Sequence, residues 1–193
     1  MLKRRQDYQP PAFLVISVFI TIDIKDDATD VTTKLAVRRN PDAAADAPLW
    51  LDGQNIELTR LAIDSVELPV GHDMPDGVSL SDHGLSVAGL ADEAVVEVQS
   101  RCYPQDNTAL EGLYLSGGMY CSQCEPEGFR RIGYFPDRPD VMSVFTVRIE
   151  ASTAFPQILS NGNLIETGAV GVDRHFAVWH DPHPKPSYLF AVV

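Results

Sequence analysis

The segment from 13 to 37 is the strongest constraint on how this chain can fold. Aliphatic side chains stand at every second position of its first half: Leu14, Ile16, Val18, Ile20, Ile22 and Ile24. A period of two with β-branched side chains predicts a strand with one strongly buried face. After a polar turn at 25–30 the same spacing returns, at Val31, Thr33, Leu35 and Val37. The two runs together predict a β-hairpin.

Short strand-like runs recur along the rest of the chain. They lie at 48–53, 55–64, 84–90, 94–100, 144–152, 157–168, 174–181 and 187–193. Turn-forming dipeptides separate the runs, and 14 prolines argue against long helices. We therefore predict an all-β fold, either a β-sandwich or an open, curved, barrel-like sheet.

Four of the segments carry specific expectations. Ser-Asn-Gly-Asn at 160–163 lies between two apolar runs and is the clearest hairpin signal in the chain. Residues 38–48 are expected to form a loop or a short helical turn, and residues 68–84 a long, mobile surface loop. The run at 187–193 is apolar to its last residue, so we expect the chain to be one domain of a longer protein.

The length and the charge limit the function. A chain of 193 residues can bury a real core, as one large domain or two small ones. Lys and Arg total 15 against 27 Asp and Glu, a formal net charge of −12. An acidic surface repels phosphate backbones, so we expect no nucleic-acid partner. The same charge attracts cationic groups such as a protonated amine.

The N-terminal residues resemble a secretory signal, because basic side chains precede an apolar run. However, Pro10 and Pro11 separate the two parts, and acidic residues follow where a cleavage site would be. The run is also shorter than the roughly 20 apolar residues of a membrane span. We therefore expect neither a signal nor a membrane anchor. Three cysteines are an odd number for a secreted disulfide framework, which favours reduced thiols and a cytoplasmic protein.

Cys121 and Cys124 form a Cys-x-x-Cys pair, a spacing found in both zinc sites and redox sites. A structural zinc site needs four ligands, and Cys102 is the one remaining cysteine. A redox pair normally opens a helix, and Pro126 and Gly128 do not fit that context. Zinc binding and redox chemistry stay open as alternatives, and packing in the core is the simpler interpretation.

Three histidines lie close together in the sequence: His175, His180 and His183. In a strand, His175 and His180 would face opposite sides, because they are an odd number of residues apart. We interpret all three as loop and strand-end histidines, and we predict no metal site in this chain. HExxH, a Gly-rich phosphate loop and Gly-x-Ser-x-Gly are all absent. No catalytic residue is therefore assigned, and whether the chain alone is an enzyme stays undecided.

Gln123 and Glu125 are the candidate binding residues. Glu125 precedes Pro126, which biases its backbone towards an extended or turn conformation. A carboxylate beside an amide oxygen can clamp an ammonium group, which has three donors. The alternative is an ordinary solvated loop carboxylate. Nearby arginines are expected to pair with neighbouring carboxylates rather than to bind an anion: Arg130, Arg131 and Arg138.

The segment from 107 to 149, "NTALEGLYLSGGMYCSQCEPEGFRRIGYFPDRPDVMSVFTVRI", resembles the N-terminal domain of the aminopeptidase N family of zinc metallopeptidases, in its bacterial alanyl aminopeptidase branch. The segments "FPQILSNGNLIETG" and "VWHDPHPKPSYLFAVV" are similar to the same family. The resemblance is strong from 106 to 193 and looser from 8 to 101.

The resemblance implies an all-β, saddle-shaped domain, as in the aminopeptidase N and leukotriene A4 hydrolase family. It implies that residues 1–193 are a single N-terminal β domain of a longer multidomain aminopeptidase. The catalytic zinc domain would follow Val193, so zinc would belong to the full-length enzyme and not to this fragment. The fragment by itself would be inactive.

The resemblance also implies roles for two residues. In the family, the Glu of Gln-Cys-Glu helps to bind the free α-ammonium group of a peptide substrate, and the Gln lines the first side-chain pocket. By motif match these are Glu125 and Gln123. A stand-alone β-sandwich binding module without catalysis is the alternative. The preferred N-terminal residue of the substrate, the oligomeric state and the roles of the three cysteines are not determined by the sequence.

Overall fold

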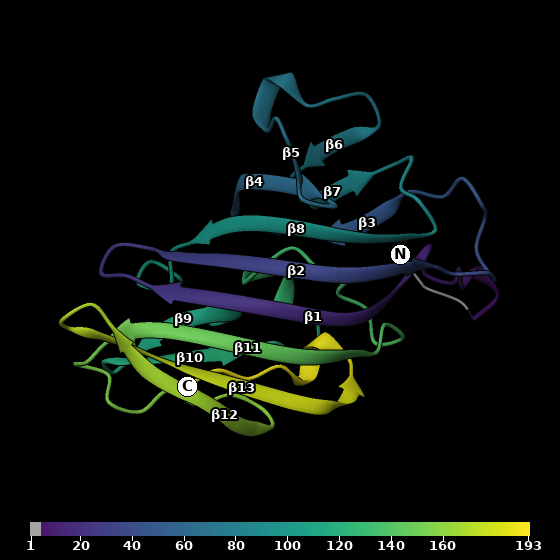
Figure 1. Ribbon diagram of the computed structural model, residues 1–193. Coiled ribbons are helices and arrows are strands. Elements are labelled where there is room, and N and C mark those ends of the chain that lie inside the picture. Colours follow the sequence, from purple (N-terminus) through teal and green to yellow (C-terminus); the bar gives the residue numbers. More distant parts are fainter. Residues whose placement is uncertain (1–4) are drawn as a thin grey trace.

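The fold is built on a twisted sheet of eight strands (Figure 1), seen in a computed structural model that describes residues 5–193. The strand order is β12-β13-β11-β1-β2-β8-β4-β5. The strands are β1 Phe13–Ile24, β2 Thr29–Arg39, β4 Glu57–Ile63, β5 Val66–Leu68, β8 Glu93–Cys102, β11 Ser143–Ser152, β12 Asn163–Val170 and β13 Arg174–Lys185. β1 pairs in parallel with β11, which joins the N-terminal hairpin to the C-terminal half of the chain.

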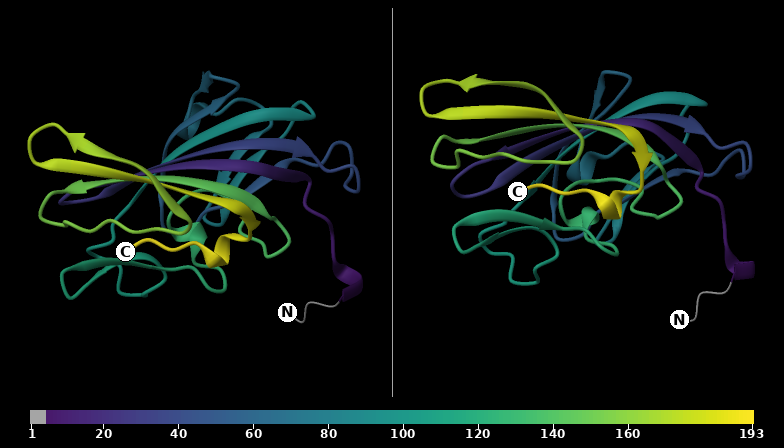
Figure 2. Two further views of the ribbon diagram at one scale, coloured as in Figure 1. Left: turned by 60° about the horizontal axis from the view of Figure 1, so that its bottom comes forward. Right: turned by 90° about the horizontal axis from the view of Figure 1, so that it is seen from below.

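Two smaller sheets complete the β structure. Their strands are β3 Leu49–Asp52, β6 Val78–Ser81 and β7 Gly84–Val87 in one, and β9 Gly112–Ser116 and β10 Met119–Gln123 in the other. Figure 2 shows the β9–β10 hairpin and the C-terminal segment together on one side of the main sheet. Within residues 5–193 the helices are short 3-10 turns: η1 Arg5–Asp7, η2 Gly71–Asp73, η3 Phe129–Arg131 and η4 Ser187–Leu189. The all-β prediction is confirmed.

The predicted hairpin of β1 and β2 is present, but its buried face changes along β1. Ile20 and Ile22 are fully buried, as expected from the alternation, whereas Ile16 is 47% exposed. The pairing of β1 with β2 shifts register between Val15 and Ser17, so the buried positions before the shift are Phe13 and Val15. A bulge adds one residue and moves the following side chains to the other face.

The apolar run that resembles a signal is β1 itself, and the basic residues before position 5 lie outside the described part of the chain. Among residues 5–193 no helix is long and apolar enough to cross a membrane.

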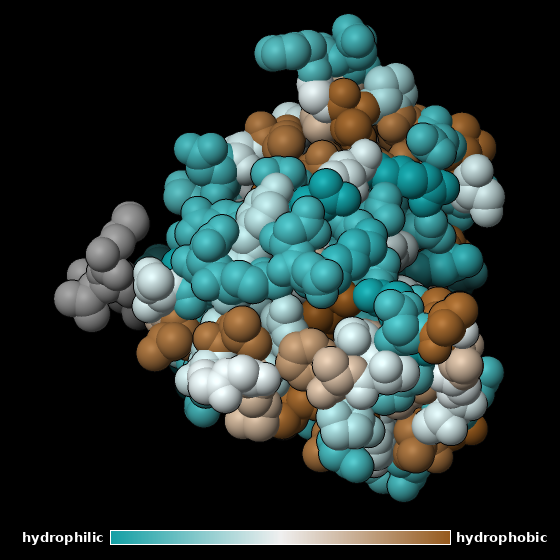
Figure 3. All heavy atoms as spheres, turned by 90° about the vertical axis from the view of Figure 1, so that its left-hand side faces the viewer, coloured by the Kyte–Doolittle hydropathy of each residue, from teal (hydrophilic) through white to brown (hydrophobic). Residues whose placement is uncertain are grey.

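Ion pairs connect several strand ends at one end of the main sheet. Lys25 Nζ lies 2.5 Å from Asp30 and 3.2 Å from Asp23. Arg101 Nε lies 2.7 Å from Asp30, and Arg174 also pairs with Asp23. The hydrogen bond from Arg101 holds the pKa of Asp30 below its ordinary value. Figure 3, which faces this side of the molecule, shows a broad band of hydrophilic side chains there. These charges are paired with one another and connect β1, β2, β8 and β13.

The β9–β10 hairpin was not predicted. Its turn is Gly117-Gly118, and both residues have positive φ, +58° and +83°. Such a two-residue turn matches the twist of antiparallel strands and favours glycine, so Gly-Gly between two short apolar runs is the signal that would have found it. The omission matters because β10 ends at Gln123.

The hairpin predicted at Ser-Asn-Gly-Asn is wrong. Residues 156–159 are not a strand, and β12, which begins at Asn163, pairs with β13 instead. Gly162 has φ +88°, and a Cβ there would lie 2.3 Å from the His180 carbonyl oxygen. The glycine therefore lets the chain turn tightly against β13, but Ser160 and Asn161 direct their side chains to the C-terminal segment.

Three further expectations need correction. Residues 68–84 are not one long loop, because β6 begins at Val78 and pairs with β7 as a hairpin. Residues 187–193 are not a strand: they form η4, and then Val192 makes a single bridge to Ser160. The three histidines all lie in β13, so none is a loop residue, although His175 stands near the start of the strand as expected. Residues 40–48 form turns, as predicted.

Four phenylalanine rings form the aromatic centre of the core. Phe129, on η3, packs edge-on against Phe135, Phe145 and Phe190, with ring centroids 5.4, 6.3 and 5.0 Å away. All four side chains are buried. The cluster joins η3, β11 and the C-terminal segment, and therefore fixes the loop that precedes η3 against the main sheet.

Replacing Phe129 with Ala is expected to lower the free energy of unfolding by about 3–5 kcal/mol, because a fully buried ring leaves a cavity. The measurement is urea unfolding followed by circular dichroism. The control is Phe19→Ala, whose ring is 42% exposed and should cost less than about 1 kcal/mol. Equal losses for the two variants would show that the cluster does not support the core.

The cysteines occupy different environments. Cys102 and Cys124 are buried in the core, Cys121 is partly exposed, and all three are free thiols. Burial raises the pKa of Cys102 to about 12 and raises the pKa of Cys124 as well. A thiol that resists ionisation is a poor nucleophile, so the burial of Cys102 and Cys124 favours the core-packing interpretation over redox chemistry.

A thiol reagent at pH 8 is expected to modify Cys121 rapidly and to reach Cys102 and Cys124 only after denaturation.

The folded pKa of Cys102 lies above its ordinary value of 9.0, so the unfolded chain loses this proton first. Stability should therefore fall as the pH rises above about 9, measured by urea unfolding at several pH values. Cysteines that become reactive only after a chelator is added would instead indicate a bound metal.

Candidate functional site

The structure brings Gln123 and Glu125 together at the end of β10. Gln123 is the last residue of the strand and pairs with Gly112 of β9. Both side chains are exposed, and the Gln123 amide Nε2 donates to the Glu125 carbonyl oxygen at 3.1 Å. The Glu125–Pro126 peptide bond is cis, and a turn follows that leads into η3. The Gln123 side chain is therefore held against the backbone of Glu125, and both residues are exposed at this strand end.

Glu125 differs from the other carboxylates of this region in having no cationic partner among residues 5–193. The other four between 111 and 140 are paired with arginine: Glu111 with Arg131 at 3.1 Å, Glu127 with Arg130 at 3.4 Å, Asp137 with Arg130 at 3.0 Å and Asp140 with Arg138 at 2.7 Å. The prediction that these arginines pair with nearby carboxylates is confirmed. The arrangement leaves the Glu125 carboxylate available for a cation from outside the domain.

The loop that carries Glu125 closes on itself. The Gly128 N–H donates to the Cys124 carbonyl oxygen at 2.8 Å, and the Arg131 N–H donates to the Gly128 carbonyl oxygen at 3.1 Å. A Cβ at Gly128 would lie 2.2 Å from the Gln123 carbonyl oxygen, so a larger residue cannot fit without moving the strand end. The buried Cys124 side chain anchors the loop from below. Glu125 is thus held on a short, constrained turn.

The buried Asp137 carboxylate connects this loop to other elements of the fold. Asp137 accepts hydrogen bonds from Arg130 Nε at 3.0 Å and from Ser187 Oγ at 2.5 Å, and its own N–H donates to Asp52 at 2.9 Å. Burial is the largest single influence on the pKa of Arg130 and would lower it, but the hydrogen bond with Asp137 and the charges of Asp52, Asp137 and Glu127 together raise it. Burial raises the pKa of Asp52. The network connects η3, β3 and η4, and it keeps Arg130 charged.

The C-terminal segment lies beside the end of β10. The Ser122 N–H donates to the Val192 carbonyl oxygen at 3.0 Å, and the Val192 N–H donates to Ser122 Oγ at 2.7 Å. Gln123 is therefore one residue away from a strand-like contact with residue 192. Sequence reasoning did not find Ser122 or Asp137, because each acts through a partner at least 50 positions away in the chain.

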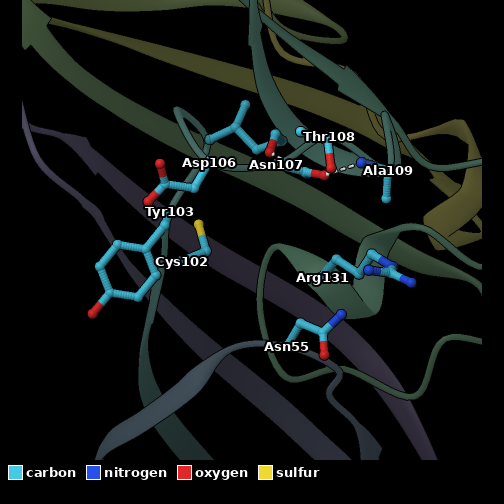
Figure 4. A pocket seen from close by; sticks show the side chains of 9 residues that line it. Asn55, Cys102, Tyr103, Asp106, Asn107, Thr108, Ala109 and Arg131 are labelled. Atoms are coloured by element: carbon cyan, nitrogen blue, oxygen red, sulfur yellow. Dashed lines mark hydrogen bonds between the residues drawn. The ribbon is translucent and has the colours of Figure 1, made fainter.

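A separate polar pocket of about 280 Å³ lies between β8, β9 and η3 (Figure 4) and does not include Gln123 or Glu125. Its lining residues are Asn55, Cys102, Tyr103, Asp106, Asn107, Thr108, Ala109, Leu113 and Arg131. The Asn107 side chain donates to the Glu111 and Leu113 carbonyl oxygens and accepts from the Ala109 N–H. Asn107 thus shapes the loop, and Arg131 is paired with Glu111.

The histidines of β13 take part in structural hydrogen bonds. His175 Nε2 lies 2.8 Å from the Phe155 carbonyl oxygen, and His180 Nδ1 lies 2.9 Å from Thr146 Oγ1. Across residues 5–193, His, Cys, Asp and Glu side chains form no group of three that could hold a metal ion. Structural contacts therefore account for His175 and His180, and Gln123 and Glu125 stay the candidate binding residues.

Comparison with known proteins agrees with this architecture. Residues 7–189 match the model of the peptidase M1 N-terminal domain family. The chain is 44% identical to aminopeptidase N of Caulobacter vibrioides over 187 residues, and 40% identical to aminopeptidase N of Escherichia coli over 194 residues. These matches cover 97% and 99% of the chain, but only 21% of each relative.

Solved structures show the same fold. Aminopeptidase A of Legionella pneumophila superposes with a TM-score of 0.89 at 32% identity, over 98% of this chain and 22% of that protein. Leukotriene A4 hydrolase of Saccharomyces cerevisiae shares the fold at 17% identity, with a TM-score of 0.71, over 100% of this chain and 31% of that protein. The all-β, saddle-shaped fold expected from the resemblance is confirmed. This chain belongs to the M1 family of zinc metallopeptidases and is an N-terminal domain of that family.

Proposed function

We propose that this chain is the substrate-anchoring domain of a longer zinc-dependent aminopeptidase, which removes N-terminal residues from peptides. The chain spans about one fifth, 21%, of the aminopeptidases that it matches, and it matches them as an N-terminal domain. The peptide substrate, the zinc ion and a catalytic domain after Val193 all belong to this proposal. The free thiols support a cytoplasmic location, where cysteines stay reduced.

The observation that carries the proposal is the unpaired Glu125 carboxylate beside the Gln123 amide. A free N-terminus is an ammonium group with three donors, and it needs acceptor oxygens held in fixed positions. The carboxylate of Glu125 would accept a charge-assisted hydrogen bond, and the Gln123 side chain would face the first residue of the peptide. Glu127 is less suited to this role, because Arg130 lies 3.4 Å from its carboxylate.

Anchoring of the ammonium group would support catalysis by position. A carboxylate at a fixed distance from the reacting centre would place the first peptide bond there, one residue from the N-terminus. It would also hold the carbonyl of that bond in a reactive geometry. When zinc is bound in the remainder of the enzyme, it supplies Lewis-acid activation of water and the carbonyl. The described residues hold no ligand set for it, so we assign to this chain binding and orientation only.

In the longer enzyme, Glu125→Gln is expected to lower kcat/KM for an alanine anilide by about 10- to 150-fold, because one charge-assisted hydrogen bond is worth about 1.5–3 kcal/mol. Steady-state kinetics with a chromogenic anilide provide the measurement. The matched control is Glu127→Gln, two residues away, whose carboxylate pairs with Arg130 and should change kcat/KM by less than about threefold. Similar losses in both variants would place the ammonium site elsewhere.

The 193-residue chain alone is expected to show no turnover of the same anilide, and no stoichiometric zinc by elemental analysis. The reason is that the described residues contain no group of three side chains that could hold a metal ion, and the proposed catalytic domain lies outside this chain. Chelator-sensitive turnover by the pure chain would contradict the proposed division of labour. A reading frame without a zinc-binding motif after Val193 would favour the alternative of a stand-alone binding module.

A further inference from the structure

The last residues of the chain are bonded on both sides, like a central strand. On one side, the Val193 N–H and carbonyl group exchange hydrogen bonds with Leu159, at 3.0 and 2.8 Å. On the other side, Val192 exchanges two hydrogen bonds with Ser122. Chain segments near a terminus are usually loosely held unless they dock on the domain. Here the segment is inserted between the loop before β12 and the end of β10.

Asn161 provides the bonds that a strand partner would otherwise supply. Its Nδ2 donates to the Leu189 carbonyl oxygen at 3.1 Å, and its Oδ1 accepts from the Ala191 N–H at 2.8 Å. One carboxamide thus satisfies two backbone groups that are two residues apart. Ser160 Oγ adds a hydrogen bond to the Ala191 carbonyl oxygen at 2.8 Å. This explains why Ser-Asn-Gly-Asn, the strongest turn signal in the sequence, does not form a hairpin.

All six backbone polar groups of residues 191–193 are therefore satisfied, and side chains supply three of the partners: Ser122, Ser160 and Asn161. Buried or docked backbone needs such partners, since an unpaired group is costly. The contact on the β10 side reaches the candidate site directly, because Ser122 precedes Gln123 in the same strand. Only two residues separate Ser122 from Glu125.

We infer that Asn161 and Ser122 are positioning residues for the ammonium site. They clamp the C-terminal segment to the end of β10, and they thereby fix Glu125 relative to the polypeptide that follows Val193. The inference rests on the proposed function, in which the reacting carbonyl is held by that following polypeptide. It adds that the distance between the anchor and the reacting centre is set by side chains outside the binding site. A small displacement of a binding group can reduce the rate strongly without any lost contact to substrate.

The test uses the longer enzyme and two inhibitors, alanine hydroxamate and acetohydroxamate. Both carry the metal-binding hydroxamate, but only the first has an ammonium group that needs Glu125 at the correct distance. The readout is a ratio: the inhibition constant of acetohydroxamate divided by that of alanine hydroxamate. This ratio is above one when the ammonium group adds affinity. In Asn161→Ala this ratio is expected to fall about tenfold toward unity, while inhibition by acetohydroxamate stays unchanged. Unchanged inhibition by acetohydroxamate also shows that the variant is folded.

Two further variants make the result decisive. Ser122→Ala removes the acceptor for the Val192 N–H on the other side of the segment, and should lower the ratio in the same direction. Asn163→Ala is the matched control, because this exposed side chain lies two residues from Asn161 and forms no hydrogen bond among the described residues. Its ratio should equal that of the wild type. If Asn161→Ala does not fold, Ser122→Ala alone decides the question.

Comparison with Glu125→Gln separates this inference from the proposed function. If Glu125→Gln lowers the ratio and both clamp variants keep the wild-type ratio, the clamp does not position the site and the inference is wrong. If Glu125→Gln also keeps the wild-type ratio, the ammonium site itself has been misplaced. A reduced ratio in all three variants, with a normal Asn163→Ala control, supports both.

Discussion

The packing of Phe129 against three other phenylalanine rings is the interaction on which the rest of the candidate site depends. Phe129 lies on a single 3-10 turn, which has little stability of its own. Contact with Phe145 of β11 and Phe190 of the C-terminal segment makes this turn part of the core. Because the loop of Glu125 runs directly into η3, the aromatic cluster fixes that loop on the main sheet.

Hydrogen bonds then fix the relative positions of the segments that the aromatic packing holds in the core. The Asp137 carboxylate joins Arg130 of η3 to Ser187 of η4, and the Asn161 carboxamide holds the segment after η4. These bonds connect elements that the aromatic rings also connect, so the same segments are fixed by packing and by hydrogen bonds. Among the paired charges that result, the Glu125 carboxylate keeps its acceptor capacity free.

Much of the fold was predictable from the sequence, because strands leave a period-two pattern wherever one face is buried. The β1–β2 hairpin and the all-β class followed from that pattern. The pattern did not show the register shift at Val15–Ser17, which reverses the exposure of Ile16. It also did not show the partner of β12, since strand pairing between distant segments depends on contacts that no local pattern contains. Gly117-Gly118, with positive φ at both residues, is the local signal for the β9–β10 hairpin.

The candidate site, like the fold, was predictable from the sequence only in part. The all-β class, the adjacency of Gln123 and Glu125, and the resemblance to zinc aminopeptidases all follow from the order of residues along the chain, because they depend on local order and composition. The contacts within the tertiary structure determine which of the five carboxylates between 111 and 140 has no arginine partner within residues 5–193, and what Asn161 binds. Both are outcomes of pairing across the fold: arginines occupy the neighbouring carboxylates, and a turn-forming Asn meets the backbone of residues 189–191.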